Sequence, residues 1–219
     1  MYRVSATLLD SFRLYKTAEF ISTEELDARI RRDPMEPSEA MKIGTAFHGI
    51  AEGRCGCAGD PAAPEGAAYT CDGYVFDAET ADAALSWCRG GVPEVKKASV
   101  VIPSEFGPIA IVGKADYLRG LMADEIKTKV GKEFNPADYI DAWQWRVYMR
   151  VFGVRSVVYR LVRLDLRDGI YFSKRDDLVL YPYSALDAEV DAEVRAVARY
   201  AADRGILDYL TQSSEGIAA

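Results

Sequence analysis

The sequence has no apolar run close to the roughly 20 residues that a membrane-spanning helix requires. Its first residues, MYRVS, also lack the apolar stretch and the small-residue cleavage site of a signal peptide. From these two absences we expect a cytoplasmic protein with no membrane partner. At 219 residues, 49% of them hydrophobic, the chain is long enough for one sizeable domain with a full core.

The four cysteines, Cys55, Cys57, Cys71 and Cys88, include no C-x-x-C pair. Disulfides are rare in the cytoplasm, and Cys55 and Cys57 are too close in sequence for an ordinary disulfide loop. All four lie between residues 55 and 88, so a zinc or iron–sulfur site is an alternative. Unligated thiols are the favoured interpretation.

The net charge of −7 argues against a protein that coats nucleic acid indiscriminately. An enzyme that grips DNA in one basic channel remains compatible with it, because the local field depends on how the charges are distributed. Lys and Arg outnumber Asp and Glu between residues 127 and 175, whereas acids dominate residues 184–219.

Apolar spacing, capping residues and turn signals predict an α/β chain without internal repeats. We expect a single domain over residues 1–219, with a central mixed β-sheet flanked by α-helices and an insertion or capping element at about 54–93. The predicted helices are 5–17, 22–32, 39–53, 78–89, 136–152 and 185–210. The predicted strands are 69–76, 98–103, 109–118, 121–127, 156–164 and 169–181, and residues 54–68 are a predicted loop.

Two acids and a lysine fall on neighbouring predicted strands. Asp116 precedes the Gly120 turn, and Glu125 and Lys127 follow it, so the two carboxylates can meet. Glu125 and Lys127 are two residues apart and therefore point to the same face of a strand. Mg²⁺ binds through one or two carboxylates plus a substrate phosphate. The ammonium can orient or help deprotonate a water molecule, or offset charge on the phosphate.

Two helical pairs accompany this strand motif. His48, the single histidine of the chain, lies within Gly44–His48, and Glu52 follows four residues later on the same helix face, where it can support the imidazole. Gln144 and Tyr148 are also four residues apart, so a carboxamide and a phenol share one face and can hold a phosphate or brace Lys127. Each pair alone also fits an ordinary helix surface.

These four motifs, in this order, resemble the PD-(D/E)XK nuclease superfamily, in particular its RecB-like and phage-exonuclease branch. The matching segments are 44–48, 113–116, 125–128 and 144–148. The resemblance implies a restriction-endonuclease-like core, and metal ligation by His48, Asp116, Glu125 and the Ile126 carbonyl. It also implies that Lys127 is the catalytic lysine, acting with Asp116 and Glu125, and that Gln144 and Tyr148 are the pair typical of the branch.

The chain departs from the family pattern at three points. Ala115 stands where the superfamily has the proline of its name, and Asp124 precedes Glu125, although the spacing to Lys127 favours Glu125 as the ligand. The iron–sulfur members of CRISPR systems carry three cysteines near their C-terminus. Here no cysteine follows Cys88, which argues against such a cluster.

Three functions fit these motifs. The first is a hydrolase that uses Mg²⁺ or Mn²⁺ to degrade DNA ends, an exonuclease of the phage recombination and repair type. The second is the nuclease subunit of a helicase–nuclease or CRISPR-adaptation system, and the third is a catalytically decayed DNA-binding or assembly protein. The resemblance implies double-stranded DNA ends, a homo-oligomer and a single-strand annealing protein as partners. Trp143, Trp145, Arg146 and Arg150 are compatible with bases and phosphates near the site, and equally with core packing.

Overall fold

The computed structural model describes residues 1–17, 21–55 and 69–211. Its strands are β1 (Tyr2–Ser5), β2 (Tyr69–Cys71), β3 (Tyr74–Phe76), β4 (Val92–Ile102), β5 (Ile109–Arg119), β6 (Met122–Val130), β7 (Ser156–Arg167) and β8 (Ile170–Leu180). Its helices are α1 (Ala6–Lys16), α2 (Thr23–Arg31), α3 (Glu39–Ala51), α4 (Ala78–Cys88), α5 (Pro136–Ile140), α6 (Trp143–Phe152), α7 (Leu186–Asp203) and the 3-10 helix η1 (Leu207–Thr211).

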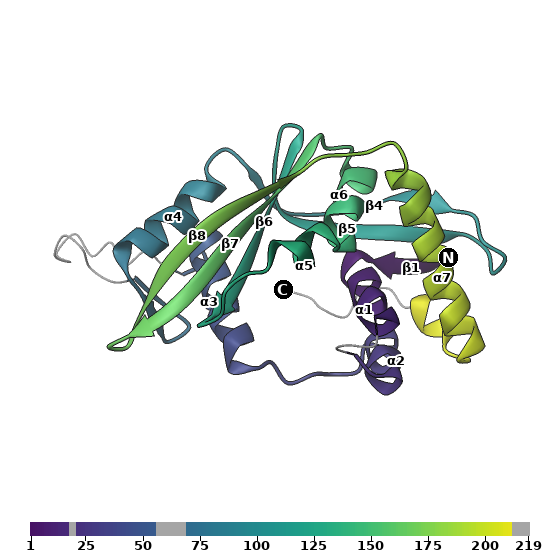
Figure 1. Cartoon of the computed structure of the whole chain (residues 1–219), viewed down its shortest axis with the longest axis horizontal. Coiled ribbons are helices and arrows are strands. Elements are labelled where there is room, and N and C mark those ends of the chain that lie inside the picture. The colour runs from purple at the N-terminus through teal and green to yellow at the C-terminus, as the bar shows by residue number, and fades with distance from the viewer. Residues whose placement is uncertain (18–20, 56–68, 212–219) are drawn as a thin grey trace.

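The described strands form one mixed eight-stranded sheet in the order β1-β5-β6-β7-β8-β3-β2, and β4 pairs with β5. Three pairs are parallel, β1 with β5, β6 with β7, and β3 with β8, and the other pairs are antiparallel. Helices cover both faces of the sheet (Figure 1). The expected α/β class with a central mixed sheet is therefore confirmed.

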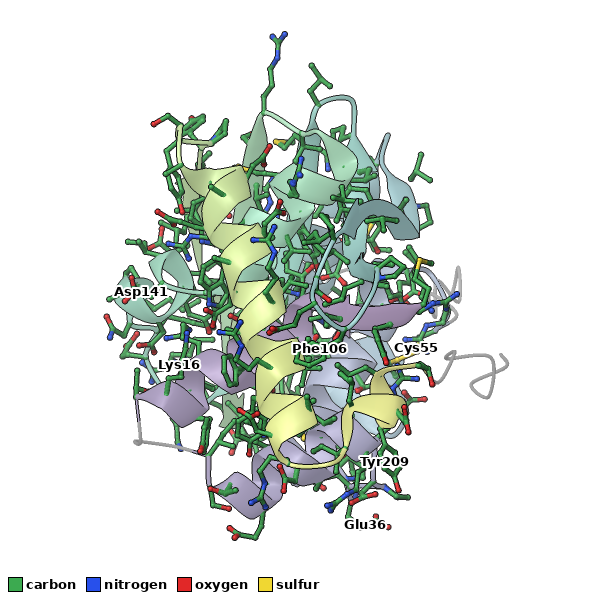
Figure 2. The ribbon with its side chains drawn as sticks, turned by 90° about the vertical axis from the view of Figure 1, so that its right-hand side faces the viewer. Lys16, Glu36, Cys55, Phe106, Asp141 and Tyr209 are labelled. Carbon is green, nitrogen blue, oxygen red and sulfur yellow. A yellow bond between two sulfur atoms is a disulfide. The ribbon has the colours of Figure 1, made fainter. Side chains whose placement is uncertain are left out.

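Each face of the sheet has its own apolar core. Helices α1, α2, α6 and α7 pack over one face around Val147, Tyr159 and Val194, and α3 and α4 pack over the other around Phe47 and Phe76. Figure 2 shows α7 on the outside of the layer formed by α1, α2, α6 and α7, with Lys16 to one side of it. The Lys16 ammonium lies 2.6 Å from the carboxylate of Glu193 on α7. None of the described helices is long and apolar enough to cross a membrane.

The predicted helix starts agree closely with the structure. Ser5, Ser22 and Ser38 are the N-caps of α1, α2 and α3, and each side chain accepts a hydrogen bond from a backbone N–H of the first turn. Ser22 and Glu25 also complete a capping box. These caps fix where α3 begins, and therefore where His48 lies along it.

Four predicted elements are corrected. Residues 69–76 form the β2–β3 hairpin, which extends the sheet beyond β8, and β4 begins at Val92. The predicted helix 136–152 is interrupted and gives α5 and α6. The predicted helix 185–210 ends at Asp203, because Gly205 takes a left-handed φ of 68°. Strand β1 was not predicted at all. Most of the loop expected at 54–68 lies outside the described residues, and the insertion at 54–93 stays a prediction.

Candidate active site

The site lies where β5 and β6 separate. Their register covers Tyr117–Arg119 of β5, beyond which β6 continues along β7 while β1 pairs with the start of β5. Asp116 lies at this fork, and its Oδ2 accepts a hydrogen bond from the Ile126 N–H at 2.8 Å. The carboxylate thus takes the place of a main-chain acceptor, which fixes it between the two strands.

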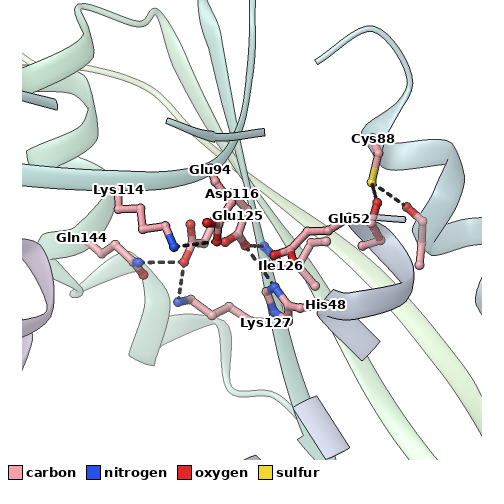
Figure 3. Close-up of polar contacts among 12 residues, drawn as sticks. His48, Glu52, Cys88, Glu94, Lys114, Asp116, Glu125, Ile126, Lys127 and Gln144 are labelled. Carbon is pink, nitrogen blue, oxygen red and sulfur yellow. Dashed lines mark hydrogen bonds and ion pairs between the residues drawn. The ribbon is translucent and has the colours of Figure 1, made fainter. Parts of the chain in front are cut away.

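Glu125 points toward α6 and is held by three side chains, of which Figure 3 shows Gln144 and Lys127. Its Oε1 accepts hydrogen bonds from Gln144 Nε2 at 2.7 Å and from Lys127 Nζ at 2.9 Å, and its Oε2 accepts one from the Tyr148 hydroxyl at 2.9 Å. Gln144 Nε2 also lies 2.8 Å from the Tyr148 hydroxyl. The structure therefore brings Glu125, Lys127, Gln144 and Tyr148 into one network.

Two glycines allow the helices to approach the fork. A Cβ atom at Gly44 would lie 2.6 Å from Oγ1 of Thr128, so the glycine lets α3 lie close against β6. A Cβ atom at Gly113 would lie 3.2 Å from the Phe152 ring and 3.4 Å from the Tyr148 ring, so this glycine gives room to α6. Both glycines belong to the segments that carry the family resemblance.

His48 reaches the fork from α3. Its Nδ1 lies 3.8 Å from Oδ2 of Asp116, and its ring also interacts with the Ile126 backbone. Burial lowers the pKa of His48, although the charges of Glu125 and Glu52 oppose this effect. The imidazole is therefore neutral near pH 7 and keeps a lone pair for a ligand. Glu52 itself is the C-cap of α3 and pairs with Arg54, so it acts on His48 through its charge.

The ionisable groups of the fork influence one another. Burial, and then the charge of Glu125, raise the pKa of Asp116 to about 8, so this carboxyl is largely protonated near pH 7. Burial lowers the pKa of Lys127, but the charges of Glu125, Asp116 and Asp10 outweigh it and leave that pKa raised. Lys127 therefore stays an ammonium, and it pairs with the Glu125 carboxylate at 2.9 Å. A divalent cation bound at the fork would favour the ionised form of Asp116.

The donors at the fork suit such a cation. Two carboxylates, one neutral imidazole and a backbone carbonyl are ligands that Mg²⁺ or Mn²⁺ accepts. Two ligands at about 2.1 Å from one ion lie at most about 4.2 Å apart, so the 3.8 Å between His48 and Asp116 fits. Glu125 is turned toward Tyr148 and Gln144, and it would have to rotate to join them.

The tightest group of metal-type side chains in the described part of the chain lies elsewhere. Cys55, Cys71 and Asp72 have ligand atoms within 4.8 Å of one another, whereas His48, Asp116 and Glu125 are spread more widely. Cys55 and Cys71 form a disulfide, so the expectation of unligated thiols was wrong for this pair. Cys88 is a free thiol, and Cys57 lies outside the described residues.

The structure separates the two neighbouring acids of β6. Asp124 is fully buried on the opposite face from Glu125, where its Oδ1 accepts hydrogen bonds from Arg160 Nε at 2.9 Å and Nη2 at 2.7 Å. Arg119 lies 3.5 Å from its other oxygen. Asp124 is thus neutralised by arginines away from the fork, and Glu125 is the acid that faces Lys127.

The aromatic and basic residues of α6 largely contact one another. Trp145 is buried and its Nε1 donates to the Ile140 carbonyl, and the Arg146 guanidinium lies 4.6 Å from the Trp145 ring centre. Arg150 pairs with Asp187 and Asp191. Of the two interpretations of this segment, core packing accounts for these contacts.

Two features of the site have no local signal in the sequence and were not predicted. Asp10 on α1 accepts a hydrogen bond from the Trp143 N–H at 2.6 Å, and its lone acidic position in α1 gave no signal. A cavity of about 1180 Å³ opens beside Gln144 and Tyr148. Its lining includes basic residues from four separate segments, Arg3, Arg29, Arg32, Lys96 and Lys114, together with the acids Glu25 and Asp33. Because these basic residues are far apart in the sequence, their proximity could not be predicted from it.

No protein-family model matches the sequence, and a search of curated proteins gives no significant match. Among solved structures, the chain is similar to a candidate exonuclease from Eubacterium rectale, with 14% identity over 94% of this chain and 82% of that one and a TM-score of 0.51. It is also similar to the alkaline exonuclease LHK-Exo from Laribacter hongkongensis, with 20% identity over 95% and 91% of the two chains and a TM-score of 0.42. The first of these likenesses supports a shared fold, a mixed sheet flanked by helices.

Proposed function

We propose that this chain is a PD-(D/E)XK-type deoxyribonuclease of the RecB-like branch, which uses Mg²⁺ or Mn²⁺ to hydrolyse DNA phosphodiester bonds. The observation that carries the proposal is the convergence of Asp116, Glu125, Lys127 and His48 at the fork between β5 and β6. Three elements, α3, β5 and β6, meet there, and they bring together the carboxyl, imidazole and ammonium groups that a divalent cation site of this kind would use.

Each residue has a separate task in this proposal. His48, Asp116, Glu125 and the Ile126 carbonyl would hold the cation, which when bound lowers the pKa of water and polarises the phosphate. Lys127 carries its proton, so it donates hydrogen bonds to the phosphate or the water and offsets the charge that builds up during cleavage. It is thus better suited to electrostatic stabilisation than to removing a proton from water.

Gln144 and Tyr148 control Glu125. Their N–H and O–H groups donate to its two oxygens, which orients the carboxylate and limits its rotation. Burial and the charge of Glu125 raise the pKa of Tyr148 well above its ordinary value, so the phenol remains a donor. If Glu125 turned to hold a cation, the same donors would be free to bind a phosphate oxygen of the substrate.

The basic cavity supports a DNA substrate. Gln144 and Tyr148, which contact Glu125, line this cavity together with Arg3 and Arg32. Cationic groups along a groove attract the phosphates of a strand, whatever its sequence. A strand end that enters here would lead its scissile phosphate toward Lys127. This path favours attack at DNA ends, as in a phage-type recombination exonuclease.

The test is digestion of end-labelled linear DNA and of closed circular DNA, with Mg²⁺ or Mn²⁺ and with a chelator. We expect linear DNA to be degraded, circles to survive, and the chelator and Lys127→Ala each to stop the reaction. Cutting of circles would replace the exonuclease with an endonuclease. Equal inactivity of the wild type and Lys127→Ala would refute the nuclease and favour a DNA-binding or assembly protein.

A further inference from the structure

Asp10 joins two helices that are far apart in sequence. It lies on α1, and its Oδ1 accepts a hydrogen bond at 2.6 Å from the N–H of Trp143, the first residue of α6. The N–H of Gln144 also interacts with this carboxylate. The Asp10 side chain is 23% exposed. A carboxylate of α1 therefore receives the first N–H groups of α6.

Helix α6 needs such an acceptor. The first N–H groups of a helix have no partner within the helix, and the N-cap of α6 is Ala142, whose methyl group cannot accept a hydrogen bond. A negative charge at this end also interacts favourably with the helix dipole. Asp10 meets both needs from another part of the chain. It thereby sets the position of the turn that carries Gln144.

The same carboxylate acts on the fork through its charge. Asp10 is among the groups that raise the pKa of Lys127, after Glu125 and Asp116. Burial raises the pKa of Asp10, while its hydrogen bond from Trp143 and the charge of Lys127 oppose that effect. Asp10 thus lies close enough to Lys127 for their charges to interact. The hydrogen bond that its carboxylate accepts comes from α6 and not from a candidate ligand.

We propose that Asp10 is a positioning residue, which caps α6 and so holds Gln144 and Tyr148 against Glu125. The chain of contacts runs from Asp10 to the Trp143 N–H, along the first turn of α6 to Gln144, and from Gln144 Nε2 to Glu125 Oε1. Without the cap, the first turn of α6 loses its acceptor and Gln144 its fixed distance from Glu125. The activity readout of this proposal rests on the proposed nuclease function.

The test compares Asp10→Ala with Asp10→Asn. Asparagine keeps an oxygen that can accept the Trp143 N–H, whereas alanine removes it. In Asp10→Ala we expect faster hydrogen exchange at the Trp143 and Gln144 amides, and a kcat about 10- to 100-fold lower with little change in KM. Asp10→Asn loses only the charge, whose contribution is the smaller one, and should stay close to the wild type in both values. Adding Ala142→Ser to Asp10→Ala supplies a local cap and should restore much of the loss. Glu105→Ala, an exposed acid paired with Arg199, is the matched control and should change nothing.

Two results would overturn the proposal. One is unchanged amide exchange in Asp10→Ala. The other is a kcat in Asp10→Asn as low as in Asp10→Ala, because the charge and not the cap would then be responsible. If Asp10→Ala does not fold, Asp10→Asn decides alone, and faster exchange or a lower kcat in it contradicts the cap. If the wild type cleaves no DNA, the proposed function fails, while amide exchange at Trp143 and Gln144 still tests Asp10.

Discussion

Asp124 and Glu125 are neighbours on β6, yet their side chains lie on opposite faces of the sheet and have different charged partners. Asp124 is fully buried on the α3–α4 side of the sheet, with Arg160 and Arg119 around it. Glu125 lies on the α6 side, near a second carboxylate, one lysine and a neutral imidazole. The first acid is balanced by two arginines, whereas the second has a single lysine and lies near another carboxyl.

This difference separates a structural acid from a functional one. A buried carboxylate paired with arginine is fixed by its partner and has no room for a ligand. Asp116, a buried carboxyl with a raised pKa beside Glu125, is an arrangement that costs stability unless something else binds there.

The largest effect is expected from the removal of Lys127, the ammonium that pairs with Glu125 at the fork. Lys127→Ala should lower the rate of DNA cleavage by about 10²- to 10⁴-fold, the range expected for a group that acts directly on the reacting atoms. Folding should change little. The measurement is the initial rate of label release, with Lys174→Ala as the control, since that ammonium is 73% exposed. Equal rates in the two variants would contradict a role for Lys127.

The opposite face should respond in stability. Asp124→Asn leaves Arg160 and Arg119 without their buried partner, and we expect the free energy of unfolding to fall by about 3 kcal/mol. Urea denaturation followed by circular dichroism measures this change. Asp176→Asn, a substitution at an exposed acid of β8, is the control. A loss below about 0.5 kcal/mol in Asp124→Asn would break the assignment of Asp124 as a structural acid.

Cation binding should stabilise the fork and leave the Asp124 side unaffected. Mg²⁺ at 100 times its Kd would add about 2.7 kcal/mol to the free energy of unfolding, because it binds the folded chain alone. Thermal unfolding with and without Mg²⁺ measures the shift in Tm. The shift should disappear in Asp116→Asn and persist in Asp124→Asn. Its persistence in Asp116→Asn would place the cation elsewhere.

Asp27 extends the comparison to a second structural acid. Burial raises its pKa, but hydrogen bonds from Arg204 and Tyr200 outweigh this and leave the pKa below its ordinary value of 3.8. A lowered pKa contributes stability that is present above 3.8 and is lost as the pH falls below it. We expect Asp27→Asn to cost about 2 kcal/mol at pH 7 and progressively less below pH 3.8. A gap that is constant with pH would show that the charge of Asp27 is irrelevant.

Much of the fold and the members of the candidate site could be predicted because their signals are local. Serine caps, alternating strands and the Gly120 turn each act within a few residues. The spacing of Glu125 and Lys127 on one strand, and of Gln144 and Tyr148 on one helix, also places each pair on one face. The relative orientation of Asp124 and Glu125 follows from the same strand alternation.

The rest depends on contacts between distant segments. Strand β1 forms because the edge of β5 accepts Tyr2–Ser5, more than 100 residues away. No glycine or proline marks the break between α5 and α6 in the sequence. The break lies just before Trp143, whose N–H donates to Asp10. By contrast, Gly205 did mark the end of α7. The basic cavity and the Cys55–Cys71 disulfide likewise unite segments whose proximity no local pattern indicates.

The most direct test of this account is the Mg²⁺-dependent release of label from linear DNA by Glu125→Gln and by Asp124→Asn, measured at a temperature where both variants are folded. The two substitutions remove the same charge from adjacent residues. The account predicts that Glu125→Gln loses cleavage while Asp124→Asn keeps a rate close to that of the wild type. Loss of cleavage in Asp124→Asn with retention in Glu125→Gln would contradict it.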